Sequence, residues 1–283
     1  MNWPHKLRAP WFLLCRTFSA WNEHEAPRVG AALAFYSILS MAPLVVLAIA
    51  IVALFFGRST AESHLLGQVE SMIGEQGSDA VKGMIEQAQK PIGGTFASLV
   101  GLITLLFGAS GVFGELRSAL NRMWDVKPAT GSGIWGLARE RFFSFGMVLA
   151  VGFLLLVSLI ISAGLAAVGK SLGGFLRGHK FLLSGVGVIV SLAGTTGSFA
   201  LIFRYVPEAR APWKDVWLGG AATALLFTIG KHLIGLYLGE AAVGSAYGAA
   251  GSLVVILVWV YYSAMIFIFG AEFTHELGAG GPR

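Results

Sequence analysis

The feature that most constrains this chain is an uncharged run of 24 residues, 248–271, which ends at Glu272. As a helix with a rise of about 1.5 Å per residue, this run is about 36 Å long and can cross a hydrocarbon core of about 30 Å with some tilt. Trp259, Tyr261 and Tyr262 stand in the middle of the run. Because such residues usually occupy the membrane–water interfaces, we expect these three to face other helices or a wet cavity.

The composition extends the membrane assignment to the whole chain. Of the 283 residues, 55% are hydrophobic and 12% are charged, and the mean hydropathy is +0.73. Soluble domains carry about 25% charged residues. The fold class is therefore predicted to be all-α, a polytopic membrane protein. The net charge of +5 is explained by basic loops that orient spans in an anionic membrane, so we expect membrane lipids as partners and no nucleic acid.

Six transmembrane helices are predicted, together with amphipathic surface helices. The first span contains Pro43, whose missing N–H predicts a kink, which we interpret as a hinge. Small residues four positions apart favour close helix approach and leave a homo-oligomer open; they occur at Gly235 and Gly239, Gly244 and Gly248, and Ser110 and Gly114. The predicted spans are residues 29–57, 94–113, 142–168, 181–205, 213–238 and 248–271.

Polar segments divide the chain into three parts. Residues 1–28 form a cytoplasmic amphipathic segment, which either lies on the membrane surface or packs against the spans. Residues 29–277 form the six-helix domain, and 278–283 form a cytoplasmic tail. Within the domain, residues 58–91 are predicted to be an extracytoplasmic helical insertion with breaks around Gly74 and Gly77.

The orientation follows from the Lys and Arg residues outside the spans. The smaller group consists of Arg58, Lys82, Lys90, Lys170, Arg177 and Lys180. The larger group consists of Lys6, Arg8, Arg16, Arg28, Arg117, Arg122, Lys127, Arg139, Arg141, Arg204, Arg210, Lys214 and Arg283. The positive-inside rule places the larger group, and with it both termini, in the cytoplasm.

The motifs of the common enzyme classes are missing from the sequence. It has no phosphate-binding GxxxxGK[ST], no GxSxG, no HExxH and no GxGxxG with an acidic partner. Its six histidines are scattered without the spacing of metal ligands. We therefore expect no enzyme activity, no catalytic residue, no cofactor and no metal.

Ionisable residues at membrane depth are the first candidates for function. Lys231 and His232 interrupt the fifth span, and such residues usually face a cavity or a pathway. We predict a substrate pathway formed by these two residues with Tyr36, Trp259 and Tyr262. The alternative is that Lys231 only extends its long stem to the headgroups.

A second candidate group lies where the spans meet the cytoplasm. Arg117, Asn121 and Arg122 follow the second span, and Glu272 ends the sixth. We predict that these residues form a cytoplasmic mouth, in which Glu272 pairs with Arg117 or Arg122. The alternative is that they are helix-end ion pairs that only stabilise the bundle.

Four segments of the sequence resemble the YihY/BrkB family of bacterial inner-membrane proteins. They are GAALAFYSILSMAPL at 30–44, SALNRMW at 118–124, GGAATALLFTIGK at 219–231 and YGAAGSLVVILVWVYYSAMIFIFGAEFTHE at 247–276. The resemblance covers about residues 26–276 and implies a multi-pass protein of the bacterial inner membrane, described as virulence-associated or as a lipid transporter. A ribonuclease label in that family has no support in these residues. The matching positions, which bring no catalytic assignment, are Tyr36, Ser40, Pro43, Asn121, Trp124, Lys231, Tyr237, Tyr247, Trp259, Tyr262 and Glu272.

Two functional hypotheses of different classes follow. The first is a transporter or flippase-like protein for a lipid or another amphipathic anionic molecule, driven by an ion gradient or by the substrate's own gradient. The alternative is a structural or regulatory membrane scaffold that holds envelope factors through residues 58–91, without transport. A membrane-embedded hydrolase ranks third.

Overall fold

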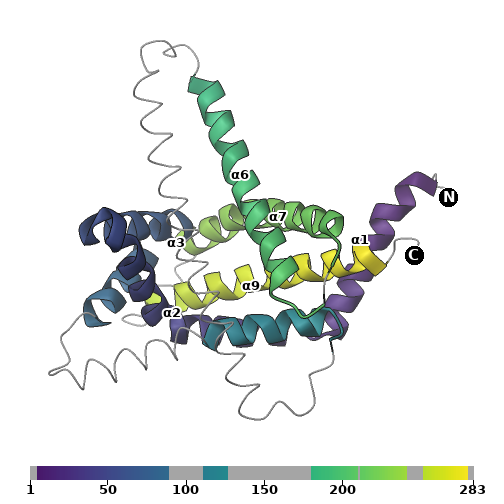
Figure 1. Ribbon diagram of the computed structural model, residues 1–283, viewed down its shortest axis with the longest axis horizontal. Coiled ribbons are helices and arrows are strands. Elements are labelled where there is room, and N and C mark those ends of the chain that lie inside the picture. The colour runs from purple at the N-terminus through teal and green to yellow at the C-terminus, as the bar shows by residue number, and fades with distance from the viewer. Residues whose placement is uncertain (1–4, 89–110, 127–179, 210, 241–250, 280–283) are drawn as a thin grey trace.

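The computed structural model describes residues 5–88, 111–126, 180–209, 211–240 and 251–279 (Figure 1). Within these ranges every element is a helix and there is no strand, which confirms the all-α prediction for this part of the chain. Residues 111–123 form a further helix. The others are α1 (His5–Glu23), α2 (Ala26–Phe56), α3 (Arg58–Ala88), α6 (Lys180–Tyr205), α7 (Trp213–Glu240) and α9 (Gly251–Ala279).

Two of the described helices are long and apolar enough to cross a membrane. They are Trp213–Tyr237 within α7 and the whole of α9, and α2 adds a third if its two halves count as one bent span. Six spans are not established, because the predicted spans 94–113 and 142–168 lie mostly or wholly outside the described residues. Helix α6 occupies the range of the fourth predicted span.

The first predicted span is bent at Pro43. Its halves, Ala26–Ala42 and Leu44–Leu54, are inclined to each other by 51°. Proline has no N–H to donate to the carbonyl four residues earlier, and its ring crowds that carbonyl, so a bend here has a local cause. Movement about this bend stays a prediction.

Helix α9 is the centre of the described part, since it contacts α1, α2, α3 and α7. Figure 1 shows α3 near one end of α9 and α1 crossing the other end. At the α1 end, α9 shares an apolar core with α2, α6 and residues 111–126, in which Met123, Phe203 and Ile268 are almost completely buried. Segments that are far apart in the sequence therefore meet around the C-terminal half of α9.

Helices α7 and α9 are antiparallel and approach each other through two reciprocal pairs. A Cβ on Gly219 would lie 1.8 Å from Thr274 Oγ1, and one on Gly270 would lie 1.9 Å from Thr223 Oγ1. Each threonine hydroxyl donates to the carbonyl four residues earlier in its own helix, at 2.7 Å, so neither is left unpaired. This interface requires glycine at both positions.

The small-residue pattern did not locate this interface. Among the described residues, a Cβ at Gly235 or at Gly114 would have no neighbouring heavy atom within 4 Å, so close approach at these two glycines stays a prediction. Gly239, Gly244, Gly248 and Ser110 lie outside the described residues or have no described side-chain environment.

Helix α1 has two different faces. One face packs on α9: Thr17 is fully buried and Arg16 forms an ion pair with Glu276 at 2.5 Å. The other face exposes large apolar side chains, among them Trp11 and Phe18. The structure therefore shows the packing against a predicted span, and a position of the exposed face at the membrane surface stays a prediction.

The long polar segment after α2 is helical, as predicted. The helix breaks at Gly74, where φ is 78°, a conformation that glycine adopts without steric penalty. The chain continues as helix through Gly77, so the break predicted around Gly74 and Gly77 lies at Gly74. Ala61 and Ile85 pack with Ile256 of α9, so α3 adds apolar contacts to the end of α9 opposite α1.

We predict that Gly219→Ala lowers the stability of the protein. The added methyl group must displace Thr274, and overpacking of this kind costs about 1–3 kcal/mol. The matched control is Gly235→Ala, which meets no neighbour and gains up to about 1 kcal/mol of helix propensity. Thermal unfolding in detergent micelles measures both variants, and equal midpoints for the two would contradict the prediction.

Candidate functional site

Four ionisable side chains from three segments meet at the C-terminal end of α9. They are His24 in the turn between α1 and α2, Asp125 after the helix 111–123, and Glu272 and His275 of α9. We call this group the His24 cluster. In Figure 1 it belongs to the end of α9 that α1 crosses.

His24 uses both ring nitrogens in this cluster. Nδ1 is hydrogen-bonded to Glu272 Oε1, and Nε2 lies 3.3 Å from Asp125 Oδ1. Nε2 of His275 lies 4.0 Å from the other oxygen of Asp125. One imidazole therefore connects a carboxylate of α9 with a carboxylate at the end of a different helix.

The geometry of two turns holds His24 and Asp125 in place. The N–H of His24 donates to Ala20 O at 2.8 Å, and the next residue, Glu25, adopts a left-handed conformation with φ of 53°. Asp125 is also left-handed, with φ of 52°, a conformation that aspartate tolerates better than most residues. Helix α1 is thus followed by the imidazole of His24, which contacts Glu272 of α9, and the helix 111–123 is followed by the carboxylate of Asp125, which lies next to His24 and His275.

Glu272 is the least accessible member of the cluster. Its side chain is 0% exposed, and Oε2 has no hydrogen-bond partner among the described residues. A buried carboxylate is unfavourable unless it is paired, hydrogen-bonded or protonated. Glu272 therefore depends on His24 for its charge compensation.

The environment of His24 acts on its pKa in two directions. Burial lowers the pKa, but the hydrogen bond to Glu272 and the negative charges of Glu272 and Asp125 outweigh burial. The net result is a pKa above the ordinary value of 6.5. The protonated ring donates from both nitrogens, which matches the two carboxylates placed around it.

The residues predicted to form a cytoplasmic mouth lie beside this cluster but have other partners. Arg117 pairs with Glu208 at 2.7 Å, and Arg122 pairs with Glu25 at 2.9 Å. Asn121 Oδ1 accepts a hydrogen bond from the backbone N–H of Glu208 at 2.9 Å. The partner of Glu272 is His24, so the expected pairing of Glu272 with Arg117 or Arg122 is wrong.

These contacts agree with one part of the predicted topology. The residues around positions 24, 122, 208 and 272 belong to segments that the basic-residue distribution assigns to one side of the membrane, and the structure brings them together. That this side is the cytoplasm stays a prediction.

Two of the predicted pathway residues lie at the interface of α7 and α9. The Trp259 ring packs edge-on against Phe227, with centroids 6.3 Å apart. Tyr262 packs against Gly230, where a Cβ would lie 3.1 Å from its ring. Lys231 follows Gly230 directly along α7 and is half-buried.

The other two pathway residues lie apart from that stretch. His232 is exposed, and its Nδ1–H donates to Thr228 O at 2.8 Å. Tyr36 belongs to α2, is 40% exposed, and has Gly111 as a neighbour. The structure thus brings Trp259 and Tyr262 together at the α7–α9 interface and places Tyr36 and His232 apart from them.

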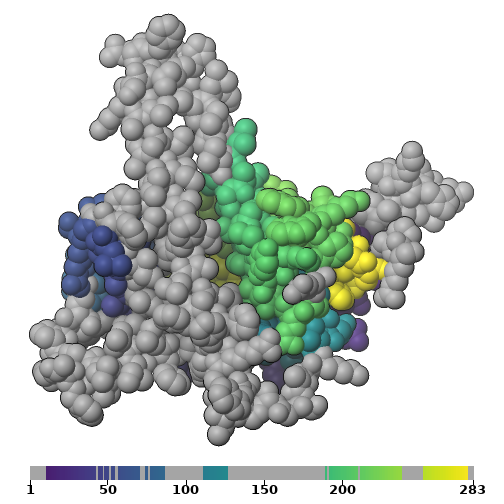
Figure 2. Space-filling view, in the orientation of Figure 1, coloured from purple at the N-terminus to yellow at the C-terminus, as the bar shows by residue number. Residues whose placement is uncertain are grey.

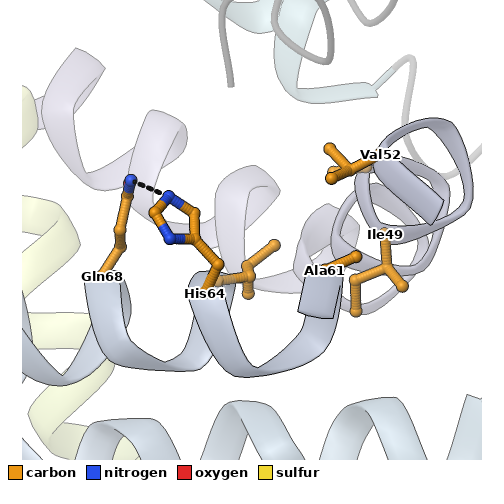
Figure 3. A pocket seen from close by; sticks show the side chains of 7 residues that line it. Ile49, Val52, Ala61, His64 and Gln68 are labelled. Carbon is orange, nitrogen blue, oxygen red and sulfur yellow. Dashed lines mark hydrogen bonds between the residues drawn. The ribbon is translucent and has the colours of Figure 1, made fainter. Parts of the chain in front are cut away.

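A pocket lies elsewhere, between α2 and α3 (Figure 3). It encloses about 290 Å³ of space, part of it open to solvent. His64 and Gln68 are hydrogen-bonded to each other at its rim, with 3.0 Å between their nitrogens. The lining residues, none of them predicted as a site residue, are Ala48, Ile49, Val52, Ala61, His64, Leu65 and Gln68.

No pattern in the sequence marked His24 and Asp125 as site residues. His24 and Glu272 are separated by 248 positions, so no spacing rule connects them. Only the prediction that both belong to the same side of the membrane pointed to a contact. In the part of the chain that the structure describes, no group of three or more His, Cys, Asp or Glu is placed to hold a metal ion.

We predict that His24 makes the stability of the protein pH-dependent. Because its pKa is raised in the folded state, its stabilising contribution is fully present below the unfolded-state pKa of about 6.5 and is lost as the pH rises through the higher folded-state pKa. The thermal unfolding midpoint in detergent should therefore fall across that window in the wild type. His24→Gln should remove this part of the pH dependence, whereas the exposed-ring control His232→Gln should retain it. A His24→Gln profile parallel to that of the wild type would contradict the prediction.

The comparisons with known proteins agree with the membrane character of these helices. Curated relatives named UPF0761 membrane protein come from Verminephrobacter eiseniae (28% identical over 95% of this chain and 63% of the relative), Albidiferax ferrireducens (26%, 96% and 65%) and Ralstonia nicotianae (27%, 90% and 56%). The chain thus spans less than two thirds of the length of these relatives. No solved structure matches it.

The family described as virulence factor BrkB matches residues 17–280. The match covers most of the chain and confirms the resemblance noted in the sequence: this membrane protein belongs to the virulence factor BrkB family.

Proposed function

We propose that this protein transports a lipid or another amphipathic, anionic molecule across the membrane. The observation that carries the proposal is the presence of ionisable side chains inside both helices that are long enough to span, Lys231 in α7 and Glu272 in α9. Such residues are unfavourable in a bilayer and usually mark a pathway for an ion or a polar substrate group.

Lys231 is the residue that attracts the anionic group of the substrate. It lies six positions before Tyr237, the end of the apolar part of α7, and so about 9 Å from that end along the helix. At this depth its stem reaches both the pathway and the headgroup region. It is half-buried and directly follows Gly230, which Tyr262 packs against, so it is close in the chain to the α7–α9 contact by which the substrate would enter.

Trp259 offers a hydrogen bond to the same substrate. Its indole Nε1–H is buried and has no hydrogen-bond partner among the described residues. Buried donors are nearly always satisfied, and a phosphate or carboxylate oxygen held by Lys231 would satisfy this one. Lys231 and Trp259 thus supply a positive charge and a donor from facing helices.

The outer surface of α7 is suited to the acyl part of an amphipathic molecule. Trp217, Leu225, Leu233 and Leu236 are exposed along this helix. Figure 2 shows α6 and α7, in green, forming much of the right-hand part of the visible surface. Exposed apolar surface of this extent is typical of contact with lipid chains, so a substrate can leave its tails in the bilayer while its headgroup moves.

The energy source follows from the chemistry available. The sequence contains no phosphate-binding loop for a nucleotide. Transport therefore uses an ion gradient or the gradient of the substrate itself.

The proposal predicts that wild-type protein in proteoliposomes accelerates the exchange of a fluorescent anionic lipid between leaflets. Exchange is measured as accessibility to a membrane-impermeant quencher. Lys231→Ala should slow exchange about tenfold or more, because a hydrogen bond to a charged group contributes about 1.5–3 kcal/mol, whereas Lys231→Arg should retain most of it.

The matched control is Lys214→Ala, which removes a positive charge from the exposed start of the same helix. If wild type gives no exchange above empty liposomes, with or without ion gradients, the transport proposal fails and the scaffold hypothesis for residues 58–91 takes its place. Equal rates for wild type and Lys231→Ala would remove Lys231 from the pathway.

A further inference from the structure

We propose that the His24–Glu272 pair is the proton-binding site of this protein, and that the proton bound there is the coupling ion of transport. The inference rests on the proposed function and adds to it the identity of the ion. The His24 cluster lies near the C-terminal end of α9, whereas α3 packs against the other end of this helix.

The first step is the number of donors that His24 can offer. A protonated imidazole donates from both nitrogens, whereas a neutral imidazole donates from one only. His24 faces Glu272 with Nδ1 and Asp125 with Nε2. With the proton bound, His24 connects both carboxylates; without it, only one of the two connections can keep its N–H donor.

The second step is the path of the proton. Side-chain exposure falls from 73% at Asp125 to 18% at His24 and to 0% at Glu272. The three groups are in contact in that order, so a proton from water reaches the buried carboxylate through the ring of His24. Nδ1 of His24 faces Oε1 of Glu272, so Oε1 is the oxygen that can accept this proton and make Glu272 a neutral acid.

The third step is the charge that surrounds the pair. From α9, His275 approaches Asp125, and Glu276 is paired with Arg16 of α1. From α7, Asp215 lies near Gly278 of α9, with its Oδ2 3.3 Å from where a Cβ on that glycine would stand. The ion pair between Arg122 and Glu25 lies beside His24. Asp125 and Glu272 are the charges in direct contact with the ring, and both favour the protonated imidazole.

The fourth step connects the site to the substrate pathway. Glu272 and Tyr262 are on the same helix, ten positions apart, which corresponds to about 15 Å. When His24 loses its proton, either α9 or the segment that ends at Asp125 is released from the turn between α1 and α2. Because α9 also carries Tyr262 and Trp259, a shift of this helix changes the α7–α9 interface at Lys231.

The test uses the full chain in proteoliposomes under an imposed pH gradient. The measured quantity is the ratio of lipid exchange rates with and without the gradient, followed together with an internal pH dye. We expect a ratio clearly above one for wild type and for the control His64→Gln, which alters a histidine far from the cluster. His24→Gln and Glu272→Gln should give a ratio of about one. A wild-type ratio of one, or an unchanged ratio in His24→Gln, would overturn the proposal.

The outcomes separate this inference from the function on which it rests. Absence of lipid exchange in wild type both with and without a gradient counts against transport, whereas exchange that ignores the gradient counts against the proton site alone. A second measurement does not depend on transport: titration of ¹⁵N-labelled histidines by NMR in nanodiscs. Glu272→Gln should shift the titration midpoint of His24 downward, because it removes the negative charge next to Nδ1. A midpoint that does not move would overturn the site even if the variants transport poorly for structural reasons.

Discussion

A carboxylate enclosed by apolar helices must have a proton, a cation or a set of donors, and this requirement organises the end of the molecule where Glu272 lies. Apolar packing brings α2, α6, α9 and residues 111–126 together there. Because the carboxylate of Glu272 is enclosed by that packing, a turn that carries a compensating side chain has to lie against α9. His24 satisfies Glu272 only because the turn after α1 is held against the bundle, so the N-terminal segment is part of the site rather than an appendage.

The sequence was informative where a physical rule acts along the chain. Long apolar runs predicted α7 and α9, Pro43 predicted the bend in α2, and the break at Gly74 followed from its position between two amphipathic stretches. Charge distribution correctly grouped the segments that meet around Glu272, because basic residues on one side of a membrane must occupy the same end of a bundle.

Prediction from the sequence was wrong or incomplete where the contacts are made between different helices. The reciprocal contacts of Gly219 with Thr274 and of Gly270 with Thr223 use glycine–threonine spacing on two helices, so a search for paired glycines on one helix selected Gly235 instead. His24 was missed for a related reason: its functional partner is fixed by tertiary packing and not by spacing. The prediction that Glu272 has a cationic partner agrees with the structure, but the partner is His24 and not one of the two predicted arginines.

The two glycine–threonine pairs also restrict how the protein can move. Each of the helices α7 and α9 receives a threonine of the other helix at a glycine, so neither can slide by one residue or rotate without a steric clash. Helix α7 is also held closely to α6, where a Cβ on Gly220 would lie 2.8 Å from Thr196 O. Helices α7 and α9 are therefore fixed against each other where these pairs lie, and any shift between them has to occur near Gly230, which faces only side-chain ends of α9. The contact between α2 and α9 is different, because Gly30 faces the sulfur of Met265, a side chain that adapts its shape. Two contacts therefore leave room for movement: the α7–α9 contact near Gly230 and the contact between α2 and α9.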